Sequence, residues 1–584
     1  MSISVRVLLL TFAASIFAAA PGTSVSAQVP DKLRPDTQAR SVVMTKLGIV
    51  ATSQPLASRA GTQILEAGGN AIDAAIAANA VLGLVEPTSN GIGGDLFAIV
   101  YEAKTGKVYG LNSSGWAPRK LTIDLLQEKG NKKMPEKGIH SVTVPGCVAG
   151  WDALRKRFGT QEFSTLLKPA IYYAEEGFPV TELISNGWRS SAKSLAAHPN
   201  SKETYLPNSE APKAGEVFRN PDLANSFKLI AEKGRDGYYK GRIAEAIVKI
   251  SEEQGGTFEL ADLEEFQPEW VEPLSTTYRG WTVYELPPNG QGIAALSMLN
   301  LLEQSPLAEY GHNSAKALHA MIEAKKLAYA DMLHYVGDPK FGKIPVKQML
   351  SKELAEKRAK EIDPDKAHES VMPSEFEDFK RKAGHDTIYM CTVDKDGNMV
   401  SLIQSNYMGF GSGLVPPKCG FMLHNRGALF TLEKDRPNSL EPRKRPLHTI
   451  IPAFMEKDGV RIAFGIMGGW NQAQAHAQFV ADLVDFKLNI QAALESPRFT
   501  KMTFEGLDVK LESRIPESVR ADLASRGHKV EMEKPFSMQM GAGQAVMRDA
   551  KGVNYGASDP RRDGCAIPEA PLFPEKPRSA VPPR

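Results

Sequence analysis

A threonine at the start of a strand is the first residue of this chain whose position suits chemistry. Thr387 follows Asp386 and opens the run TIYMCTV, which is rich in β-branched and aromatic residues up to Val393. The turn residues DKDGN come next and MVSLIQSNYM has the composition of a returning strand, so the stretch predicts a β-hairpin. The hydroxyl of a residue at the start of a strand is held against the sheet, while the backbone on its N-terminal side is not part of the strand. A nucleophile that becomes the N-terminus of a cleaved chain would lie at such a position.

The hydroxyl of threonine is a weak nucleophile unless a base takes its proton. The chain contains no G-x-S-x-G sequence, so the serine elbow of α/β-hydrolases is not indicated. If Oγ of Thr387 attacked the carbonyl of Asp386, the acyl group would move from nitrogen to oxygen, and hydrolysis of the ester would leave a new α-amine. An α-amine has a pKa of about 7.7 to 8 and can act as the general base. From the residues alone, a simple strand former at position 387 is the plainer interpretation.

The elements around this hairpin must position it. Residues 351–384 are the most charged part of the chain, which is typical of a solvated helix and linker, and internal cleavage requires a flexible polar segment before Thr387. Apolar spacing predicts two helices joined by a glycine turn between residues 58 and 82, and a helix-rich region from 120 to 270. Downstream, strands are expected at Phe421–Leu423, Ile450–Met455 and Val460–Gly465. This order favours an α/β fold with two sheets covered by helices on both outer faces.

Several segments carry a family pattern in a fixed order. They are ATSQPLASRAGTQILEAGGNAIDAAIAANAVLGLVEPTSNGIGGDLFAIVY (Ala51–Tyr101), TVPGCVAGWDAL (Thr143–Leu154), LPPNGQGIAALSMLNLLE (Leu286–Glu303), DTIYMCTVDKDGN (Asp386–Asn398), KRPLHTIIPAF (Lys444–Phe454), IMGGW (Ile466–Trp470) and YGASDPR (Tyr555–Arg561). With these segments the chain resembles the γ-glutamyltransferase (glutathione hydrolase) family of N-terminal-nucleophile (Ntn) hydrolases. The resemblance implies an α/β (α+β) fold, namely a four-layer αββα Ntn-hydrolase sandwich built from two subunits of one autocleaved precursor.

The resemblance also implies how the chain is processed. Cleavage of the Asp386–Thr387 bond would give a large subunit of residues 28–386 and a small catalytic subunit of residues 387–584, which form a heterodimer that could assemble further. Thr387 would then be the nucleophile. Gly468 and Gly469 match the family's oxyanion hole, where two backbone N–H groups bind the negative oxygen formed on attack. A plain turn is the alternative interpretation of this glycine pair.

The residues that would recognise the substrate depart from the family pattern. The family binds the α-carboxylate of a γ-glutamyl group with an arginine where this chain has Ser114, and the α-amine with an aspartate where it has Leu429. Arg426 replaces a glutamine and could hold a carboxylate with two hydrogen bonds, although an exposed or structurally paired arginine is the alternative. The other candidates implied for substrate binding are Ser405, Asn406, Asn425, His448 and Thr449, with Tyr407 in place of Asn406 in an ungapped match.

The N-terminus has the composition of a secretory signal peptide. MSISVR is followed by the apolar run VLLLTFAASIFAAA and by small residues at Val25 and Ala27, which predicts cleavage after residue 27. A membrane anchor is the alternative, but this run is shorter than the roughly 20 residues that a span needs. The mature protein is therefore expected in the periplasm or outside the cell, without a membrane span.

Composition limits the partners and cofactors. The formal net charge is +2, from 70 basic and 68 acidic residues, so no nucleic acid partner is indicated. The GIGGD run at residues 91–95 lacks the third glycine of a dinucleotide site and the Lys-Ser/Thr of a P-loop. The four cysteines are scattered and form no C-x-x-C pair, so no structural zinc is expected. We expect neither a cofactor nor a metal ion.

Together these features predict a self-processing N-terminal-threonine amidohydrolase or acyltransferase. It would cleave γ-glutamyl amides such as glutathione, or a related small-molecule or peptide amide, through an acyl-Thr387 intermediate. Two alternatives stay open. One is an acylase or small-amide hydrolase of the same family without γ-glutamyl activity, and the other is an unprocessed, non-catalytic periplasmic binding protein.

Overall fold

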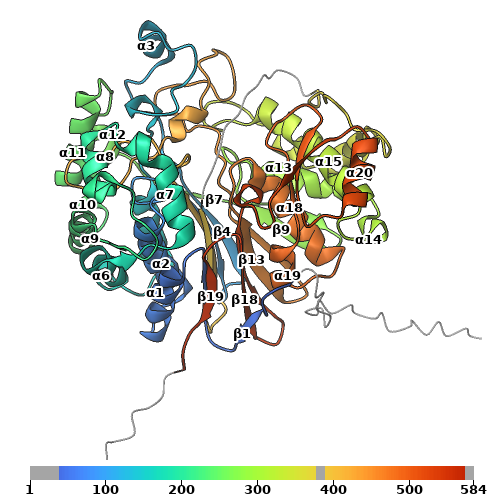
Figure 1. Ribbon diagram of the computed structural model, residues 1–584, viewed down its shortest axis with the longest axis horizontal. Helices are drawn as coiled ribbons and strands as arrows, with labels where there is room; N and C mark the ends of the chain where they lie inside the picture. Colours follow the sequence, from blue (N-terminus) through green and yellow to red (C-terminus); the bar gives the residue numbers. More distant parts are fainter. Residues whose placement is uncertain (1–37, 376–387, 572–584) are drawn as a thin grey trace, which may run out of the picture.

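The computed structural model describes residues 38–375 and 388–571. The predicted signal peptide, residues 1–27, and the predicted cleavage site at Asp386–Thr387 lie outside the described residues. Two seven-stranded antiparallel sheets lie face to face at the centre of the molecule, and helices cover the outer side of each (Figure 1). The architecture is a four-layer αββα sandwich, which confirms the predicted fold class.

The first sheet contains the predicted hairpin and has the strand order β19-β2-β10-β11-β3-β4-β7. Its strands are β2 (Ile49–Thr52), β3 (Asp95–Glu102), β4 (Lys107–Ser113), β7 (Glu269–Val271), β10 (Ile388–Val393), β11 (Met399–Ser405) and β19 (Cys565–Pro568). In the hairpin, Ile388 lies opposite Gln404 and Val393 lies opposite Met399. Because β10 lies between β2 and β11, every one of its residues is buried.

The second sheet has the order β1-β18-β17-β13-β12-β9-β8. Its strands are β1 (Val43–Thr45), β8 (Leu274–Tyr278), β9 (Trp281–Glu285), β12 (Ala453–Lys457), β13 (Val460–Ile466), β17 (Gly543–Arg548) and β18 (Asn554–Ser558). Along β10, Tyr389 and Cys391 pack in the layer between the two sheets, whereas Ile388 and Met390 pack against the helices. This alternation is the two-residue period of a strand that is buried on both faces.

The helices on the outer side of the first sheet form the larger cover. They are α1 (Pro55–Glu66), α2 (Ala71–Val85), α4 (Cys147–Phe158), α5 (Phe163–Leu166), α6 (Lys168–Glu176), α7 (Glu182–Leu195), α8 (Pro199–Tyr205), α9 (Pro221–Lys233), α10 (Asp236–Tyr239), α11 (Arg242–Glu253) and α12 (Leu260–Glu264), with the short strands β5 (Phe178–Pro179) and β6 (Val217–Phe218). The helix α3 (Ile123–Glu128) lies apart from this layer and packs against Phe430, Leu432 and Leu440 (Figure 1). α1 and α2 are the predicted pair joined by a glycine turn. α2 is buried along its whole length and begins with a capping box between Asn70 and Asp73.

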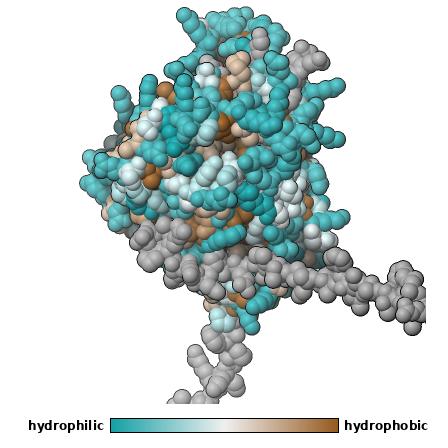
Figure 2. Space-filling view, turned by 90° about the vertical axis from the view of Figure 1, so that its right-hand side faces the viewer, coloured by the Kyte–Doolittle hydropathy of each residue, from teal (hydrophilic) through white to brown (hydrophobic). Residues whose placement is uncertain are grey.

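The second helical layer covers the other sheet. It contains α13 (Gly292–Leu302), α14 (Leu307–Tyr310), α15 (Ala315–Tyr335), α16 (Val346–Met349), α17 (Lys352–Ala359), α18 (Asn471–Val484), α19 (Ile490–Glu495) and α20 (Glu517–Ser525), and beside it lies a small sheet of β14 (Phe499–Thr500), β15 (Asp508–Glu512) and β16 (Lys529–Glu533). Figure 2 shows this side of the molecule: its surface is mostly hydrophilic and the hydrophobic areas are small and separate. The apolar faces of these helices therefore point inward, onto the sheet.

Two further observations concern the predicted elements. Within the described residues, no helix combines the length and the apolar composition needed to cross a membrane. The strand expected at Phe421–Leu423 is wrong, because this segment has no regular secondary structure. The strands expected near 450 and 460 are present as β12 and β13, although β12 begins only at Ala453.

Candidate active site

The register of the first sheet brings three strand ends together where β10 begins. Ile388, the first residue of β10, lies opposite Gln404 of β11. The next residue of β11, Ser405, lies opposite Asp95, the first residue of β3. Thr387 directly precedes Ile388 in the chain but lies outside the described residues. The side chains around this edge of the sheet therefore define the candidate site.

Asp95 is the centre of a buried polar cluster at this edge. Its carboxylate accepts hydrogen bonds from Nε of Arg426 at 2.7 Å and from Nε2 of His448 at 2.8 Å. Arg426 also donates through Nη1 to Oγ1 of Thr449 at 2.8 Å, and its guanidinium carbon lies 4.6 Å from the centre of the Tyr407 ring. The side chains of Asp95, Arg426 and His448 are 0% exposed, so the opposite charges are paired inside the protein. We call these residues, with Thr449, the Asp95 cluster.

Burial and pairing set the charges of the Asp95 cluster. Burial alone would raise the pKa of Asp95, but Arg426 and His448 outweigh it and hold that pKa well below its usual value. Burial, together with the neighbouring Arg426, lowers the pKa of His448 to about 4. His448 is therefore neutral at pH 7: its Nε2–H donates to Asp95, and its Nδ1 accepts from the backbone N–H of Ile450 at 3.3 Å. One negative and one positive charge remain, and they neutralise each other.

The low pKa of His448 predicts that the protein loses stability on acidification. The unfolded chain binds a proton at this residue below pH 6.5, whereas the folded protein binds it only near pH 4, so stability falls as the pH drops through this interval. At pH 5 the loss from this one residue amounts to about 2 kcal/mol. We expect the free energy of unfolding of the wild type, measured with urea, to fall by this amount between pH 7.5 and pH 5. In His448→Gln the contribution of this residue to the fall should be absent. An equal pH dependence in the two proteins would contradict the assignment.

The sequence left two roles open for Arg426, and the structure gives this side chain internal partners. Arg426 begins the 3-10 helix η3 (Arg426–Leu429), and its three guanidinium nitrogens contact Asp95 and Thr449. A substrate carboxylate would have to compete with Asp95 for the same cation. Leu429 is buried in the apolar core of the second layer, and Oγ of Ser114 donates to Asn112 at 2.7 Å. Neither position provides the charge that the family pattern has there.

The Gly468–Gly469 pair forms the turn between β13 and α18. Their φ angles are 128° and 62°, a region that favours glycine. Gln291 fixes this turn, because its Nε2 donates to the carbonyl of Gly469 at 2.8 Å and also to the carbonyl of Thr449. Within the part of the chain that the structure describes, neither glycine N–H donates a hydrogen bond. Two unused N–H groups beside the N-terminus of α18 suit the oxyanion hole that the resemblance implies.

The remaining predicted residues lie around the end of β11. Oγ of Ser405 accepts a hydrogen bond from the backbone N–H of Tyr407 at 2.7 Å. Asn425 joins two loops, because its Nδ2 donates to the carbonyl of Glu136 at 2.6 Å. The side-chain amide of Asn406 is fully buried and has no hydrogen-bond partner among the described residues. Asn406 is thus the candidate whose polar atoms are unused.

The sequence did not identify three residues that build this site. Asp95 and Gln291 were not among the candidates, nor was His424, whose Nε2 lies 2.8 Å from the carbonyl of Thr143 and whose Nδ1 lies 3.4 Å from Asp95. A signal for Asp95 was present in GIGGDLFAIV, where an acidic residue opens an apolar strand. A carboxylate at the start of a buried strand needs a partner, so its position predicts a polar cluster.

One group of side chains with metal-ligand chemistry lies apart from this site. Within the described residues, His319 and Glu323 of α15 and His528 place ligand atoms within 4.8 Å of one another, and all three are buried. Nδ1 of His319 lies 2.8 Å from Nε2 of His528. Lys326 donates to the Glu323 carboxylate at 2.7 Å. That carboxylate is already neutralised and offers a cation little net charge.

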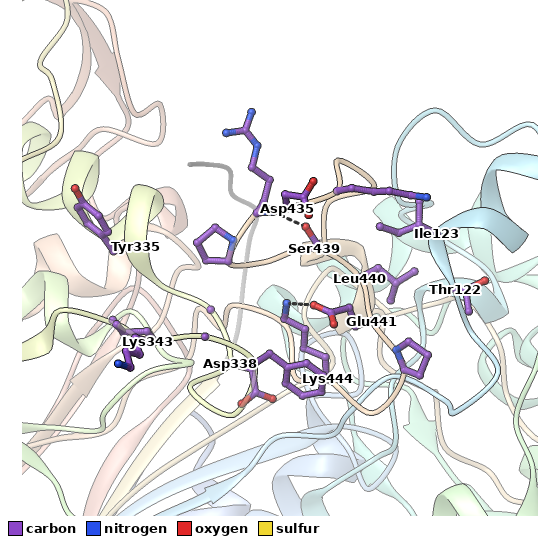
Figure 3. A pocket seen from close by; sticks show the side chains of 18 of the residues that line it. Thr122, Ile123, Tyr335, Asp338, Lys343, Asp435, Ser439, Leu440, Glu441 and Lys444 are labelled. Atoms are coloured by element: carbon purple, nitrogen blue, oxygen red, sulfur yellow. Dashed lines mark hydrogen bonds and ion pairs between the residues drawn. The ribbon is translucent and has the colours of Figure 1, made fainter. Parts of the chain in front are cut away.

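A hollow of about 530 Å³ lies beside the segment that follows η3. It is lined by residues within 122–124, 335–344 and 434–444, and Figure 3 shows Lys444 and Glu441 pointing toward each other at its wall. Their ion pair measures 2.7 Å. Neither the Asp95 cluster nor the glycine pair contributes to its lining. The hollow is therefore distinct from the candidate site.

Comparisons with known proteins agree with this geometry. The family model for gamma-glutamyltranspeptidase matches residues 57–569. The chain is 37% identical to the glutathione hydrolase-like YwrD proenzyme of Bacillus subtilis, with 90% of this chain and 99% of that protein covered. It is 33% identical to the glutathione hydrolase proenzyme of Escherichia coli, with 89% and 91% covered. A solved structure, cephalosporin acylase from Bacillus halodurans, matches with a TM-score of 0.86 at 41% identity, covering 92% of this chain and 99% of that one. The protein therefore has the Ntn-hydrolase fold and belongs to the gamma-glutamyltranspeptidase family.

Proposed function

We propose that the chain is a secreted, self-processing amidohydrolase that forms an ester between Thr387 and the acyl half of its substrate. Processing separates residues 28–386 from residues 387–584 and frees the α-amine of Thr387 as the general base. Family membership supports this proposal, as do the relatives that are named proenzymes. The position of residue 387 directly before the buried strand β10 supports it as well.

In this proposal the reaction has two halves. Oγ of Thr387 attacks the amide carbonyl carbon while its proton passes to the α-amine, and the N–H groups of Gly468 and Gly469 bind the oxygen that becomes negative. The tetrahedral intermediate then breaks its C–N bond, and the α-ammonium returns the proton to the leaving amine. Water attacks the resulting ester, with the α-amine again as base. The acid leaves and the hydroxyl of Thr387 is restored.

The acyl donor that fits this site best lacks a free α-amino acid head group. Asp95 and Arg426 are two charges beside η3 that could bind the ammonium and carboxylate of such a group, but they bind each other and are 0% exposed. Removing one partner of a buried ion pair typically costs about 3 to 5 kcal/mol, so a ligand gains little by separating them. This buried pair is the observation that carries our choice of an acylase or small-amide hydrolase. The similarity to a cephalosporin acylase supports it.

Hydrolysis of γ-glutamyl amides such as glutathione is the second candidate function. Relatives with 37% and 33% identity are named glutathione hydrolase-like and glutathione hydrolase proenzymes. In this chain, however, Ser114 and Leu429 occupy the positions where the resemblance implies the arginine and the aspartate that bind the γ-glutamyl head group. The second candidate therefore requires other contacts for both head-group charges.

A matched pair of donors tests the choice. Glutaryl-4-nitroanilide and γ-glutamyl-4-nitroanilide differ only in the α-ammonium group. We expect kcat/KM to be higher for the glutaryl donor by about tenfold or more, because an ammonium without a partner in a buried site costs well over 1.4 kcal/mol. Steady-state kinetics of the processed protein measures the ratio. A preference for the γ-glutamyl donor would replace the acylase assignment with the second candidate.

A further inference from the structure

A buried histidine and a buried glutamate lie next to the strand that leads to the glycine pair. His476 of α18 and Glu285, the last residue of β9, are each 1% exposed. Nδ1 of His476 lies 2.7 Å from Oε1 of Glu285, and its Nε2 lies 3.0 Å from the backbone nitrogen of Ile466. Ile466 ends β13, two residues before Gly468. The proposed chemistry uses neither side chain, yet together they reach the backbone just before the turn.

The two contacts of His476 fix which ring nitrogen carries the hydrogen. A backbone N–H only donates, so Nε2 accepts from Ile466 and carries no hydrogen. Burial lowers the pKa of His476 to about 3, so the ring is neutral at pH 7 and its one N–H, on Nδ1, donates to Glu285. In the other tautomer an N–H would face the N–H of Ile466, and that backbone group would lose its acceptor. Glu285 therefore selects the tautomer that Ile466 needs.

Glu285 is an unfavourable residue at this place if its role is only to stabilise the fold. Its second oxygen, Oε2, is buried and forms no hydrogen bond with the residues that the structure describes. Burial also raises the pKa of this carboxyl group well above its usual value. A buried polar atom without a partner lowers the free energy of unfolding, and an apolar side chain would avoid that loss. The hydrogen bond to His476 is thus the contact that accounts for a glutamate here.

The opposite face of β13 packs against β10, the strand that follows Thr387. Gly465 faces the layer between the sheets, and the Tyr389 ring of β10 lies so close to it that a Cβ would not fit. On the other face, the ring centres of His476 and Phe464 are 5.3 Å apart. β13 is therefore held between Tyr389 and His476. The distance from β10 to the glycine pair depends on both contacts.

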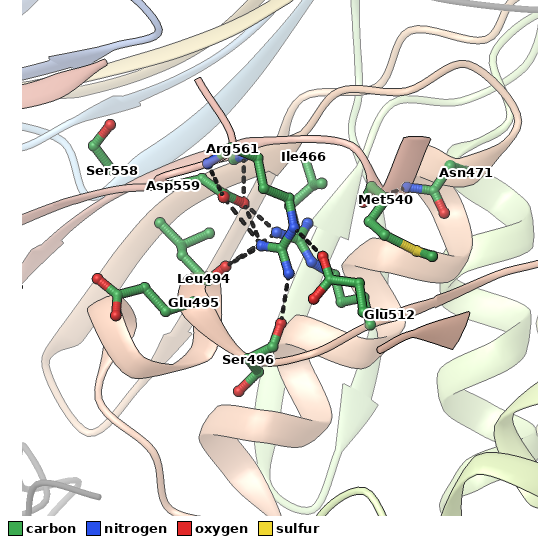
Figure 4. Close-up of polar contacts among 12 residues, drawn as sticks. Ile466, Asn471, Leu494, Glu495, Ser496, Glu512, Met540, Ser558, Asp559 and Arg561 are labelled. Carbon is green, nitrogen blue, oxygen red and sulfur yellow. Dashed lines mark hydrogen bonds and ion pairs between the residues drawn. The ribbon is translucent and has the colours of Figure 1, made fainter. Parts of the chain in front are cut away.

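The neighbouring strand β17 is fixed independently of His476. Gly543 of β17 lies opposite Ile466, and its N–H donates to the buried carboxylate of Asp559 at 3.2 Å. Arg561 donates to the same carboxylate at 3.0 Å, and Figure 4 shows this cluster beside Ile466. Since β17 has its own supports, a change at His476 acts on the end of β13 and on the turn that follows it.

We propose that His476, oriented by Glu285, is a positioning residue for the glycine pair: its hydrogen bond to Ile466 sets the direction in which the two glycine N–H groups point. The inference rests on the proposed amidohydrolase function, in which these groups bind the oxyanion. Such donors act only when they lie about 3 Å from the developing negative oxygen. A shift of about 1 Å at the end of β13 therefore lowers the rate more than it weakens substrate binding.

Two substitutions at position 476 separate positioning from packing. In His476→Gln the amide oxygen can take the place of Nε2 and accept from Ile466, whereas the shorter side chain of His476→Asn reaches only the place of Nδ1. We expect His476→Asn to lower kcat for glutaryl-4-nitroanilide about 10- to 100-fold with KM within about threefold, and His476→Gln to keep kcat within about threefold of the wild type. Both are assayed after a gel shows that they are cut. Equal kcat values in the two variants, or an effect on KM alone, would overturn the inference.

Gln478→Asn is the matched control in the same helix. Gln478 is 5% exposed, and its Oε1 accepts from the backbone N–H of Phe499 at 3.2 Å, so a shorter side chain here also removes a buried hydrogen bond to a backbone N–H. The free energy of unfolding in urea should fall as in His476→Asn, but kcat should not change. A loss of kcat as large as that of His476→Asn would show that loosening of α18 is the cause, and the inference would be wrong.

The tautomer of His476 can be measured without turnover. NMR of the processed protein with isotope-labelled histidine should show the hydrogen of His476 on Nδ1, with its signals assigned by their absence from His476→Gln. Glu285→Met, which removes the acceptor, should shift the hydrogen toward Nε2. A wild-type His476 with its hydrogen on Nε2 would overturn the inference whatever the activities are. The expected tautomer in a processed protein that hydrolyses no amide would overturn the amidohydrolase function alone.

Discussion

Replacing Thr387 with alanine should leave the protein as one uncut chain without amidase activity. Oγ of this residue is the atom that attacks the Asp386 carbonyl during processing and the substrate carbonyl during turnover, and alanine has no such atom. The expected loss is about 10⁴-fold or more in kcat, as for other covalent nucleophiles. A denaturing gel that resolves residues 28–386 from residues 387–584 measures processing, and an anilide assay measures turnover.

Two variants control this experiment. Thr387→Ser keeps an attacking oxygen and should still be cut. Thr392→Val removes the hydroxyl of another threonine in β10, whose Oγ1 donates to the carbonyl of Ala71 at 2.8 Å, and should be cut and active. Cleavage of Thr387→Ala, or full activity of an uncut wild type, would show that the Ntn mechanism is wrong.

Replacing Gly469 with alanine should lower kcat by about 10²- to 10³-fold, with a smaller change in KM. The φ angle of 62° is one that a side chain strains, so the turn shifts and its N–H groups no longer point at the developing oxyanion. The rate at saturating anilide measures the effect. The variant is compared only after a gel shows that it is cut.

Gly106→Ala is the matched control for the backbone effect. Gly106 has a φ angle of 67° in the β3–β4 turn, and a Cβ there would lie 4.0 Å from the nearest atom, the Tyr101 hydroxyl. Alanine at position 106 therefore has a similar backbone strain to alanine at position 469, but it does not contact the site. We expect kcat of Gly106→Ala to be unchanged. Unchanged kcat in a correctly cut Gly469→Ala enzyme would remove this turn from the mechanism.

Local sequence pattern was sufficient for the elements whose hydrogen bonds follow a regular ladder. The β10–β11 hairpin and the α1–α2 pair match their predictions because alternation, helical spacing and turn residues agree there. Phe421–Leu423 has the composition of a strand but pairs with residues 412–414 through only two backbone hydrogen bonds, both at Leu423. The backbone N–H groups of Ile450 and Ile451 bond to the side chains of His448 and Gln472, so β12 starts later than predicted. Tertiary contacts decided these segments.

The candidate site depended still more on long-range contacts. The glycine pair, His448 and Thr449 could be named from the resemblance alone, but the partner of Arg426 could not. Asp95 lies 331 residues before Arg426, and the register of β3 against β11 brings the two together. A single sequence shows that each charge exists. It does not show that they neutralise each other. This pairing is the reason why we propose a donor without a free α-amino acid head group in place of a γ-glutamyl amide.

The central claim is that an acyl ester forms on the hydroxyl of Thr387, and peptide-mapping mass spectrometry after an acid quench tests it most directly. The processed protein is mixed with excess glutaryl-4-nitroanilide and quenched during the steady state, when the ester accumulates if its hydrolysis is slow. We expect the N-terminal peptide of the 387–584 subunit to gain the mass of one glutaryl group, located on residue 387, and to lose it under mild base. Turnover of the anilide with the glutaryl mass on another residue, or an enzyme whose small subunit does not begin at Thr387, would contradict the account.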